Sequence, residues 1–213
     1  MRIGTLGTGA MAEALAGQWV RAGHEVMVGG RSPERAAVVA RRTGGRRGTL
    51  REAAGHGTDA VLLAVPAPVA PGLASELAPL LEGRTLIDCT NPVGPGFALT
   101  TEPGPSAAVR IASAAPGARV VKAFNLCHSG VWHLSPPVFD GRPLAVPLCG
   151  DDPDALDVVR ALVTGLGCVP FDGGGLARAG LLEATAAFLI GLWAGQGVDA
   201  QAIAPPLPYA QGS

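Results

Sequence analysis

Lysine is almost absent from this sequence: of its 16 basic side chains only one, Lys122, is a lysine. A genomic base bias explains the preference for arginine most simply, and it makes the single exception worth following. Charged residues are also scarce, at 15%, whereas apolar residues make up 48% of the 213 positions. This balance is typical of a soluble globular chain with large buried surfaces, and the length is sufficient for a sizeable core.

Cysteine pairs at metal-ligand spacing are missing as well. The four cysteines lie far apart, without a C-x-x-C pair. Neither a zinc site nor a disulfide framework is indicated, so we expect no metal and four buried free thiols. These are Cys89, Cys127, Cys149 and Cys168.

Long apolar runs are absent too. Glycine, proline or a charge interrupts each run well before the ~20 residues that a membrane span needs. The N-terminal stretch MRIGTLGTGAM enters a strand pattern without the charged start, apolar core and cleavage site of a signal peptide. We therefore expect no membrane segment and a cytoplasmic location.

Aromatic residues account for only 4% of the chain, and none interrupts the basic stretch from Arg31 to Arg51, which holds seven arginines. Proteins that read nucleic acids usually combine such a stretch with aromatic side chains or a recognisable module, and neither is present. Nucleic acid is therefore an unexpected partner. The arginines indicate instead that a small anion binds near this segment.

Short β-rich runs alternate with helical patterns along the first 125 residues. Runs such as AVLLAV are apolar on both faces, as in a parallel sheet covered by helices on both sides. The predicted fold class is α/β, a Rossmann-type doubly wound parallel sheet with a small C-terminal α/β portion. Strands are expected at 2–7, 24–30, 59–66, 84–92, 118–125, 144–150 and 168–174, with a short one near residue 48. Helices are expected at 10–22, 33–42, 74–81, 106–114, 153–166 and 176–194, followed by an extended tail from residue 195.

A glycine motif follows the first predicted strand directly. Gly7, Gly9 and Ala12 form the pattern G-x-G-x-x-A where a helix begins. Gly7 permits the tight turn, Gly9 lets the backbone approach a pyrophosphate, and Ala12 allows close helix packing. Free amides near Ala10 and Met11 would then meet the phosphate. This arrangement predicts dinucleotide binding.

The stretch VMVGGRSPERA ends the second strand without the Asp or Glu that an NAD enzyme usually has there. It offers Arg31, Ser32 and Arg35 instead, which supply a guanidinium, a hydroxyl and a further cation. Arginine can hold a phosphate bidentately, and the helix that begins at Pro33 adds its positive end. NADP(H) is therefore favoured over NAD(H). Whether Ser32 only caps this helix while the arginines remain solvated is open.

Seven segments, taken in order, carry a resemblance over almost the whole chain up to about Ala194. They are MRIGTLGTGAMAEALA, VGGRSPERA, DAVLLAVP, LIDCTNPVG, ARVVKAFN, VPLCGDDPDALDVVRALVTGLGCVPFDGG and GLARAGLLEATAAFLIGLW. Together they resemble NADP-dependent oxidoreductases of the coenzyme F-420 (8-hydroxy-5-deazaflavin):NADPH reductase family. The pieces VKAFN and CGDDPDA are the most telling, because a generic Rossmann fold does not require them.

The resemblance implies hydride transfer between NADPH and a deazaflavin coenzyme, a reaction in which orientation of two flat rings does most of the work. It also implies an NADP-binding domain over residues 1–125 and a smaller portion over 126–213 for the acceptor pocket and dimerisation. The nicotinamide would lie near Asn91 and Ala123, with the acceptor on the KAFN side. The implied NADP contacts are Thr8, Gly9, Ala10, Met11, Arg31, Ser32, Arg35, Val65, Pro66, Ala67, Asn91 and Pro92, beside the turn residue Gly7.

Three residues are catalytic candidates: His128, Asn125 and Lys122. If the acceptor is a ketone or an imine, His128 is a natural proton donor, since a histidine titrates near pH ~6.5. Lys122 ends a buried strand and either lines the pocket or extends toward solvent. Trp132 either stacks on a flat ring or anchors its loop. Glu183 is expected to accept hydrogen bonds between helices rather than act as a catalytic acid.

Three functions therefore remain open. The first is an NADP-dependent reductase of a deazaflavin; the second is an NADPH-dependent ketone or imine reductase of a biosynthetic pathway, favoured by the NLCHSGVWH loop. The third is a non-catalytic NADP(H) sensor. The last predicted helix, 176–194, is apolar nearly all round, so we expect a second copy of the chain to cover it in a homodimer.

Overall fold

The computed structural model describes residues 1–198 and residue 203. Eight strands form a central sheet in the order β10-β9-β6-β5-β4-β1-β2-β3, and two more form a hairpin. The strands are β1 (Arg2–Leu6), β2 (Glu25–Gly29), β3 (Arg46–Gly48), β4 (Ala60–Leu63), β5 (Thr85–Asp88), β6 (Arg119–Lys122), β7 (Val138–Phe139), β8 (Arg142–Pro143), β9 (Ala145–Gly150) and β10 (Val169–Asp172). The α-helices are α1 (Ala10–Arg21), α2 (Pro33–Thr43), α3 (Leu50–His56), α4 (Ala70–Leu81), α5 (Ala107–Ala114), α6 (Pro153–Gly165) and α7 (Ala179–Ile190). Short 3-10 helices are η1 (Ala67–Val69), η2 (Pro95–Phe97), η3 (Ser129–His133) and η4 (Leu176–Arg178), and η5 (Gly191–Gln196) is a π-helix.

The sheet confirms the predicted fold class and differs from it in one respect. Strands β1 to β6 pair with their neighbours in parallel, as in a Rossmann fold. Strand β9 is antiparallel to β6, with Cys149 opposite Lys122, and β10 is parallel to β9. The two C-terminal strands thus extend the same sheet in the reverse direction.

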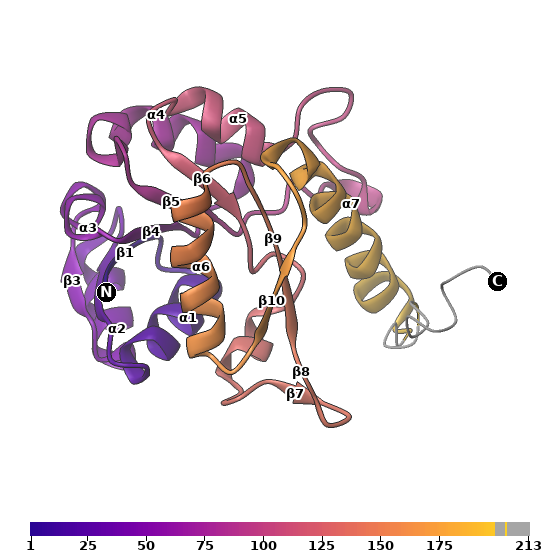
Figure 1. Ribbon diagram of the computed structural model, residues 1–213, viewed down its shortest axis with the longest axis horizontal. Coiled ribbons are helices and arrows are strands. Elements are labelled where there is room, and N and C mark those ends of the chain that lie inside the picture. The colour runs from indigo at the N-terminus through magenta and orange to yellow at the C-terminus, as the bar shows by residue number, and fades with distance from the viewer. Residues whose placement is uncertain (199–202, 204–213) are drawn as a thin grey trace.

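Helices cover both faces of the sheet (Figure 1). One apolar cluster joins the sheet to α1, α2 and α6, and a second joins it to α3, α4 and α5. Strand β4 contributes to both, since Leu62 lies in the first cluster and Val61 and Leu63 lie in the second. Successive side chains of a strand point to opposite faces, so this strand is buried on both sides as its apolar run predicts.

Helix α3 is absent from the sequence prediction, although a local signal for it exists. The Thr49 hydroxyl accepts a hydrogen bond from the Glu52 amide at 3.2 Å, and the Glu52 carboxylate accepts one from the Thr49 amide at 2.7 Å. This reciprocal capping box starts a helix of only 7 residues, too short to show a clear apolar period.

The predicted C-terminal helix is present and extends away from the sheet (Figure 1). Through η4, α7 and η5 it runs from Leu176 to Gln196, which by length and composition alone would suffice to cross a membrane, with mean hydropathy 1.4. Only 28% of its most apolar window is buried. Glu183 within it is fully buried and ion-paired to Lys122, which attaches the helix to the domain. Most of the predicted extended tail lies outside the described residues.

Candidate functional site

The turn after β1 leaves a helix N-terminus open to a ligand. Helix α1 begins at Ala10, and its N-cap residue is Gly9, which has no side chain to accept hydrogen bonds from the amides of the first turn. A Cβ atom built on Gly9 would meet no atom within 4 Å, so the space beside this residue is open. Free amides that face open space suit an anion. Thr8 and Met11 are half-buried at this turn, and Gly9 and Ala10 are exposed.

Gly7 holds the turn against the two strands that flank β1. Its φ is +133°, and a Cβ atom here would lie 2.1 Å from the Ala64 carbonyl oxygen after β4. The Gly7 amide donates a hydrogen bond to the Gly29 carbonyl oxygen of β2 at 2.9 Å. No side chain therefore fits at Gly7 without moving the backbone. The predicted contacts Val65, Pro66 and Ala67 follow β4 at this same end, partly or fully exposed.

The loop after β2 presents exposed cations beside the start of α2. Arg31 and Arg35 are exposed, and neither has an ion pair within the described residues. The Ser32 hydroxyl accepts a hydrogen bond from the Arg35 amide at 3.2 Å, so Ser32 caps α2. The same hydroxyl donates to the Glu34 carboxylate at 2.7 Å, and this bond lowers the pKa of Glu34.

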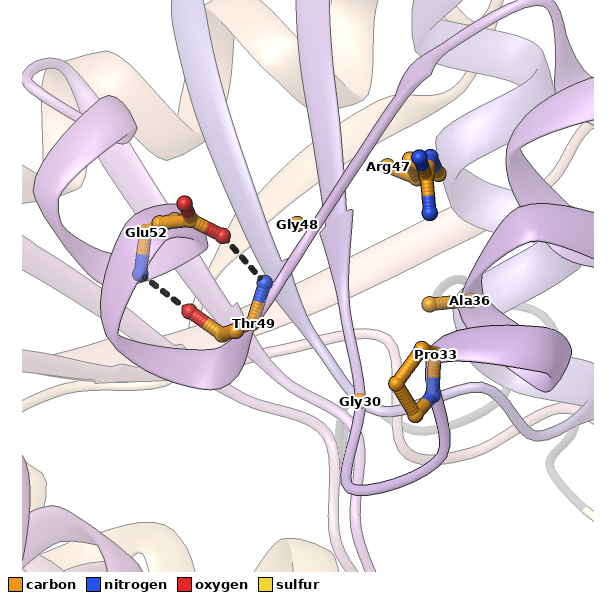
Figure 2. Close-up of a pocket in the computed structure, with 7 residues that line it drawn as sticks. All are labelled: Gly30, Pro33, Ala36, Arg47, Gly48, Thr49 and Glu52. Carbon is orange, nitrogen blue, oxygen red and sulfur yellow. Dashed lines mark hydrogen bonds between the residues drawn. The ribbon is translucent and has the colours of Figure 1, made fainter.

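A cavity of about 320 Å³ adjoins this loop, between the start of α2 and the start of α3 (Figure 2). Its polar lining, Arg47, Thr49 and Glu52, was missed by the sequence prediction. The Thr-x-x-Glu capping box was the signal that could have found two of them, and Figure 2 shows its paired hydrogen bonds along one wall. The cavity is lined by Gly30, Pro33, Ala36, Arg47, Gly48, Thr49 and Glu52.

Two asparagines join the ends of β5 and β6. The Asn91 side-chain amide donates to the Asn125 backbone carbonyl oxygen at 2.6 Å, and the Asn125 side-chain amide donates to Asn91 Oδ1 at 2.9 Å. The Asn125 amide also donates to the Leu182 carbonyl oxygen of α7 at 3.1 Å. Asn125 is only 4% exposed, yet its Oδ1 has no partner in the part of the chain that the structure describes. A buried acceptor without a donor is costly, which favours a ligand that donates there.

Lys122 lies in the interior behind this asparagine pair. Its Nζ is 2.9 Å from Asp88 Oδ2 and 3.0 Å from Glu183 Oε1, and it also donates to the Thr90 carbonyl oxygen. Burial lowers the pKa of Lys122, but the two carboxylates outweigh burial and raise it above its ordinary value. The ammonium neither borders open space nor reaches solvent. It joins β5, β6 and α7. As predicted, Glu183 of α7 accepts hydrogen bonds from another helix, donated by the Ala107 and Ala108 amides at the start of α5.

The loop that follows β6 is anchored by aromatic packing. Trp132 is 2% exposed and packs edge-to-face on Phe124 with ring centroids 5.3 Å apart. Of the two roles considered for Trp132, anchoring the loop is the one that this burial supports. His128 is exposed, and its Nδ1 accepts a hydrogen bond from the Gly130 amide at 3.1 Å at the start of η3. In the neutral ring the proton is therefore on Nε2.

The predicted residues mostly share one edge of the sheet. Because β1, β2, β4, β5 and β6 are parallel, their carboxyl ends meet there, as they do where Rossmann folds bind ligands. Gly9, Arg31 and Asn91 each follow one of these strands. Ala123 and Pro92 are buried in the backbone that forms this edge. Lys122 lies behind the edge, and His128 lies beyond it.

Comparison with known proteins finds a family that matches the N-terminal part of the chain. Residues 2–92 match the family described as NADP oxidoreductase coenzyme F420-dependent, which confirms the predicted resemblance. The chain is 33% identical over 192 residues to metalloreductase STEAP3 of Rattus norvegicus, covering 90% of this chain and 38% of that protein. The chain thus spans well under half of this relative.

Two solved structures share the fold. A protein from Arthrobacter sp. FB24, suggested to be an F420-dependent NADP reductase, superposes with a TM-score of 0.83 at 24% identity, over 93% of this chain and 96% of that one. An imine reductase from Pseudomonas sp. superposes with a TM-score of 0.67 at 22% identity, over 91% of this chain and 62% of that one. Residues 2–92 thus resemble NADP oxidoreductases, and the two solved structures share the fold of this chain.

Proposed function

We propose that this chain binds NADP(H) and transfers a hydride between it and a deazaflavin coenzyme. The observation that carries the proposal is the open, glycine-capped start of α1 beside the exposed arginines that follow β2. NADPH, when bound, would supply the hydride. The chain's own residues would bind and orient it, which is the main requirement for transfer between two flat rings.

The residues present fit a phosphorylated dinucleotide. In the proposed complex the pyrophosphate lies at the α1 amides beside Gly9, where no side chain intervenes. Arg31 and Arg35 would meet the 2′-phosphate, together with the positive end of α2. The Ser32 hydroxyl already donates to Glu34, so Ser32 contributes through the cap that begins this helix.

The nicotinamide would lie at the Asn91–Asn125 pair, beside Ala123. Asn125 Oδ1 is a buried acceptor without a donor among residues 1–198, and the nicotinamide carboxamide has an N–H group to offer it. We assign Asn125 a direct contact with the nicotinamide carboxamide. Lys122 is a positioning residue, since its ammonium holds the Thr90 carbonyl one residue before Asn91.

An imine or ketone is the second candidate acceptor. The superposition on an imine reductase and the exposed His128 favour it. The tautomer set by the Gly130 amide leaves an Nε2 proton to donate. His128→Asn is the matched variant, because asparagine can keep the cap while it removes the acid. Under the imine reading this variant lowers kcat with a cyclic imine, whereas NADPH affinity is unchanged.

The deciding experiment mixes purified protein with NADPH and oxidised deazaflavin and follows the loss of deazaflavin absorption. We expect loss that depends on the protein and is faster with NADPH than with NADH. A parallel reaction with a cyclic imine follows NADPH absorption. NADPH binding without turnover of either acceptor would contradict both enzymatic readings and favour the sensor.

The 2′-phosphate assignment has its own test. Arg31→Asp replaces an attractive charge by a repulsive one, so we expect NADPH affinity to fall at least tenfold more than NADH affinity. Arg41→Asp, on the last turn of α2, makes the same charge change and is the control. Equal effects of Arg31→Asp on both cofactors would refute the assignment.

A homodimer in the cytoplasm is the proposed assembly. Leu181 and Phe188 of α7 are 56% and 57% exposed on a helix that is apolar nearly all round. A second copy would cover this surface. Phe188→Glu should reduce the mass measured by light scattering from two chains to one, whereas Val138→Glu on the exposed hairpin should not. A monomeric wild-type protein at micromolar concentration would contradict the proposal.

A further inference from the structure

Three buried ionisable side chains form one cluster behind the proposed nicotinamide site. Asp88, Lys122 and Glu183 are each fully shielded from solvent. They come from β5, β6 and α7, so the cluster joins three elements that are far apart in the sequence. We refer to these three residues as the buried ion cluster.

The buried ion cluster contains more negative than positive charge. One ammonium lies between two carboxylates, which leaves a formal charge of minus one. The amides of Ala107 and Ala108 at the start of α5 donate to Glu183 at 3.0 and 3.2 Å. A helix N-terminus carries about half a positive charge, so it offsets only part of the excess. The raised pKa of Lys122 keeps the ammonium charged at neutral pH.

Covalent continuity fixes where this excess charge lies. Lys122 immediately precedes Ala123, and the Asp88 carboxylate accepts a hydrogen bond from the Thr90 amide at 2.8 Å, one residue before Asn91. Glu183 follows Leu182, whose carbonyl oxygen accepts from Asn125. Asp88 and Lys122 are thus three residues from Asn91 and Asn125, and Glu183 is one residue from the Leu182 carbonyl that binds Asn125. The cluster and Asn125 are buried, and the charge of buried groups is screened less than that of exposed ones.

We propose that the buried ion cluster favours the oxidised, cationic nicotinamide over the reduced, neutral one, and so makes bound NADPH a stronger hydride donor. The inference rests on the proposed function. When the C4–H bond of the reduced ring breaks, the hydride leaves with both electrons for the acceptor, and the ring is left with one positive charge. A buried negative excess stabilises that product and the partial charge of the transition state.

Equilibrium affinities test this without any turnover. The dissociation constants of NADP⁺ and NADPH are measured for the wild-type protein, Glu183→Gln and Asp88→Asn. Each variant removes one negative charge from a different element. A unit charge about 10 Å from another, at an effective dielectric constant of about 20, changes affinity on the order of tenfold. We therefore expect the ratio Kd(NADP⁺)/Kd(NADPH) to rise about tenfold in both variants.

A matched control separates buried charge from net charge. Glu76 is exposed on α4, and Glu76→Gln makes the same change in total charge. Its ratio should equal that of the wild-type protein. A merely structural role of the cluster would weaken both cofactors alike and leave the ratio unchanged, so an unchanged ratio in both cluster variants refutes the inference.

The wild-type protein provides a second measurement if the variants do not fold. An NADP⁺ analogue with benzamide in place of nicotinamide has the same shape without the ring charge. We expect NADP⁺ to bind the wild-type protein several-fold more tightly than this analogue, and equal affinities would overturn the inference. If neither NADP⁺ nor NADPH binds, the proposed function itself has failed, which is a distinguishable result.

Discussion

Replacement of Gly9 by alanine should weaken NADPH binding while it leaves the fold intact. The backbone at Gly9 has φ −84° and ψ 179°, which alanine adopts without strain, and a Cβ atom would meet nothing within 4 Å. Alanine is a poorer N-cap than glycine by roughly 0.5–1 kcal/mol. The lower entropy of the unfolded chain returns about 0.4–1 kcal/mol. The expected change in the free energy of unfolding is therefore close to zero.

The effect on binding should be large, because the new methyl group occupies the space through which the pyrophosphate approaches the amides. Loss of one hydrogen bond to a charged group costs about 1.5–3 kcal/mol, which corresponds to a ~10-fold to ~150-fold rise in Kd. Titration followed by nicotinamide fluorescence measures Kd, and thermal unfolding measures stability. In this variant the Kd for NADPH should rise while the thermal stability stays that of the wild-type protein.

Two other glycines provide the controls. Gly72 of α4 also has open space around its Cβ position, so Gly72→Ala should leave NADPH affinity unchanged. Gly7→Ala should instead destabilise the protein by at least about 2 kcal/mol, because its φ is +133° and its Cβ would lie 2.1 Å from a carbonyl oxygen. A Gly9→Ala protein with wild-type stability and wild-type Kd would refute the proposed phosphate site.

Three further predictions concern the interior. Trp132→Ala should lower the free energy of unfolding by about 3–5 kcal/mol in urea titrations, since Trp132 fills the space against Phe124; a loss below about 1 kcal/mol would show that the loop is not anchored there. Lys122→Met should cost about 3–5 kcal/mol near neutral pH, because two buried carboxylates lose their cation. Burial lowers and the carboxylates more strongly raise the pKa of Lys122 above 10.5, so its stabilisation is complete below that pH and disappears as pH rises through the higher folded value. The difference between wild-type protein and Lys122→Met should accordingly shrink only above about pH 10.5, and a difference that shrinks below pH 9 would contradict this. Burial raises the pKa of Cys89 to about 12 and that of Cys127 to about 11, so at pH 8 these two thiols should react with a disulfide reagent about a hundredfold more slowly in the folded protein than in the unfolded chain; equal rates would show that they are accessible.

The glycine turn and the helix cap at the proposed dinucleotide end could be predicted from sequence because their determinants are local. Gly7 and Gly9 act through the backbone of one turn, and Ser32 caps the helix that begins at the next residue. Each needs only its neighbours in the chain and the strand before it. The capping box of Thr49 and Glu52 was equally local, and was missed because α3 is too short to show an apolar period.

The direction of β9 and β10 could not be predicted in the same way. Their composition identifies them as strands, but the direction of a strand depends on the path of the chain before it. Here that path is the segment 127–143, which contains η3 and the β7–β8 hairpin and is held by the burial of Trp132. Its route is decided by packing against α1, and no local pattern encodes that contact.

The proposed acceptor end depends on residues that meet only after folding. Asn125 is held by Asn91 and by the Leu182 carbonyl, and Lys122 is paired with Asp88 and Glu183. These partners are separated by tens of residues, so Lys122 in the sequence alone could equally line a pocket or extend to solvent. The same separation has a functional consequence. If the proposed function holds, changes in the 127–143 segment or on α7 would alter which acceptor binds, without a change in the backbone turn that would hold the dinucleotide. This division of the site predicts that related proteins keep the same NADP-binding turn and differ in the acceptor that they reduce.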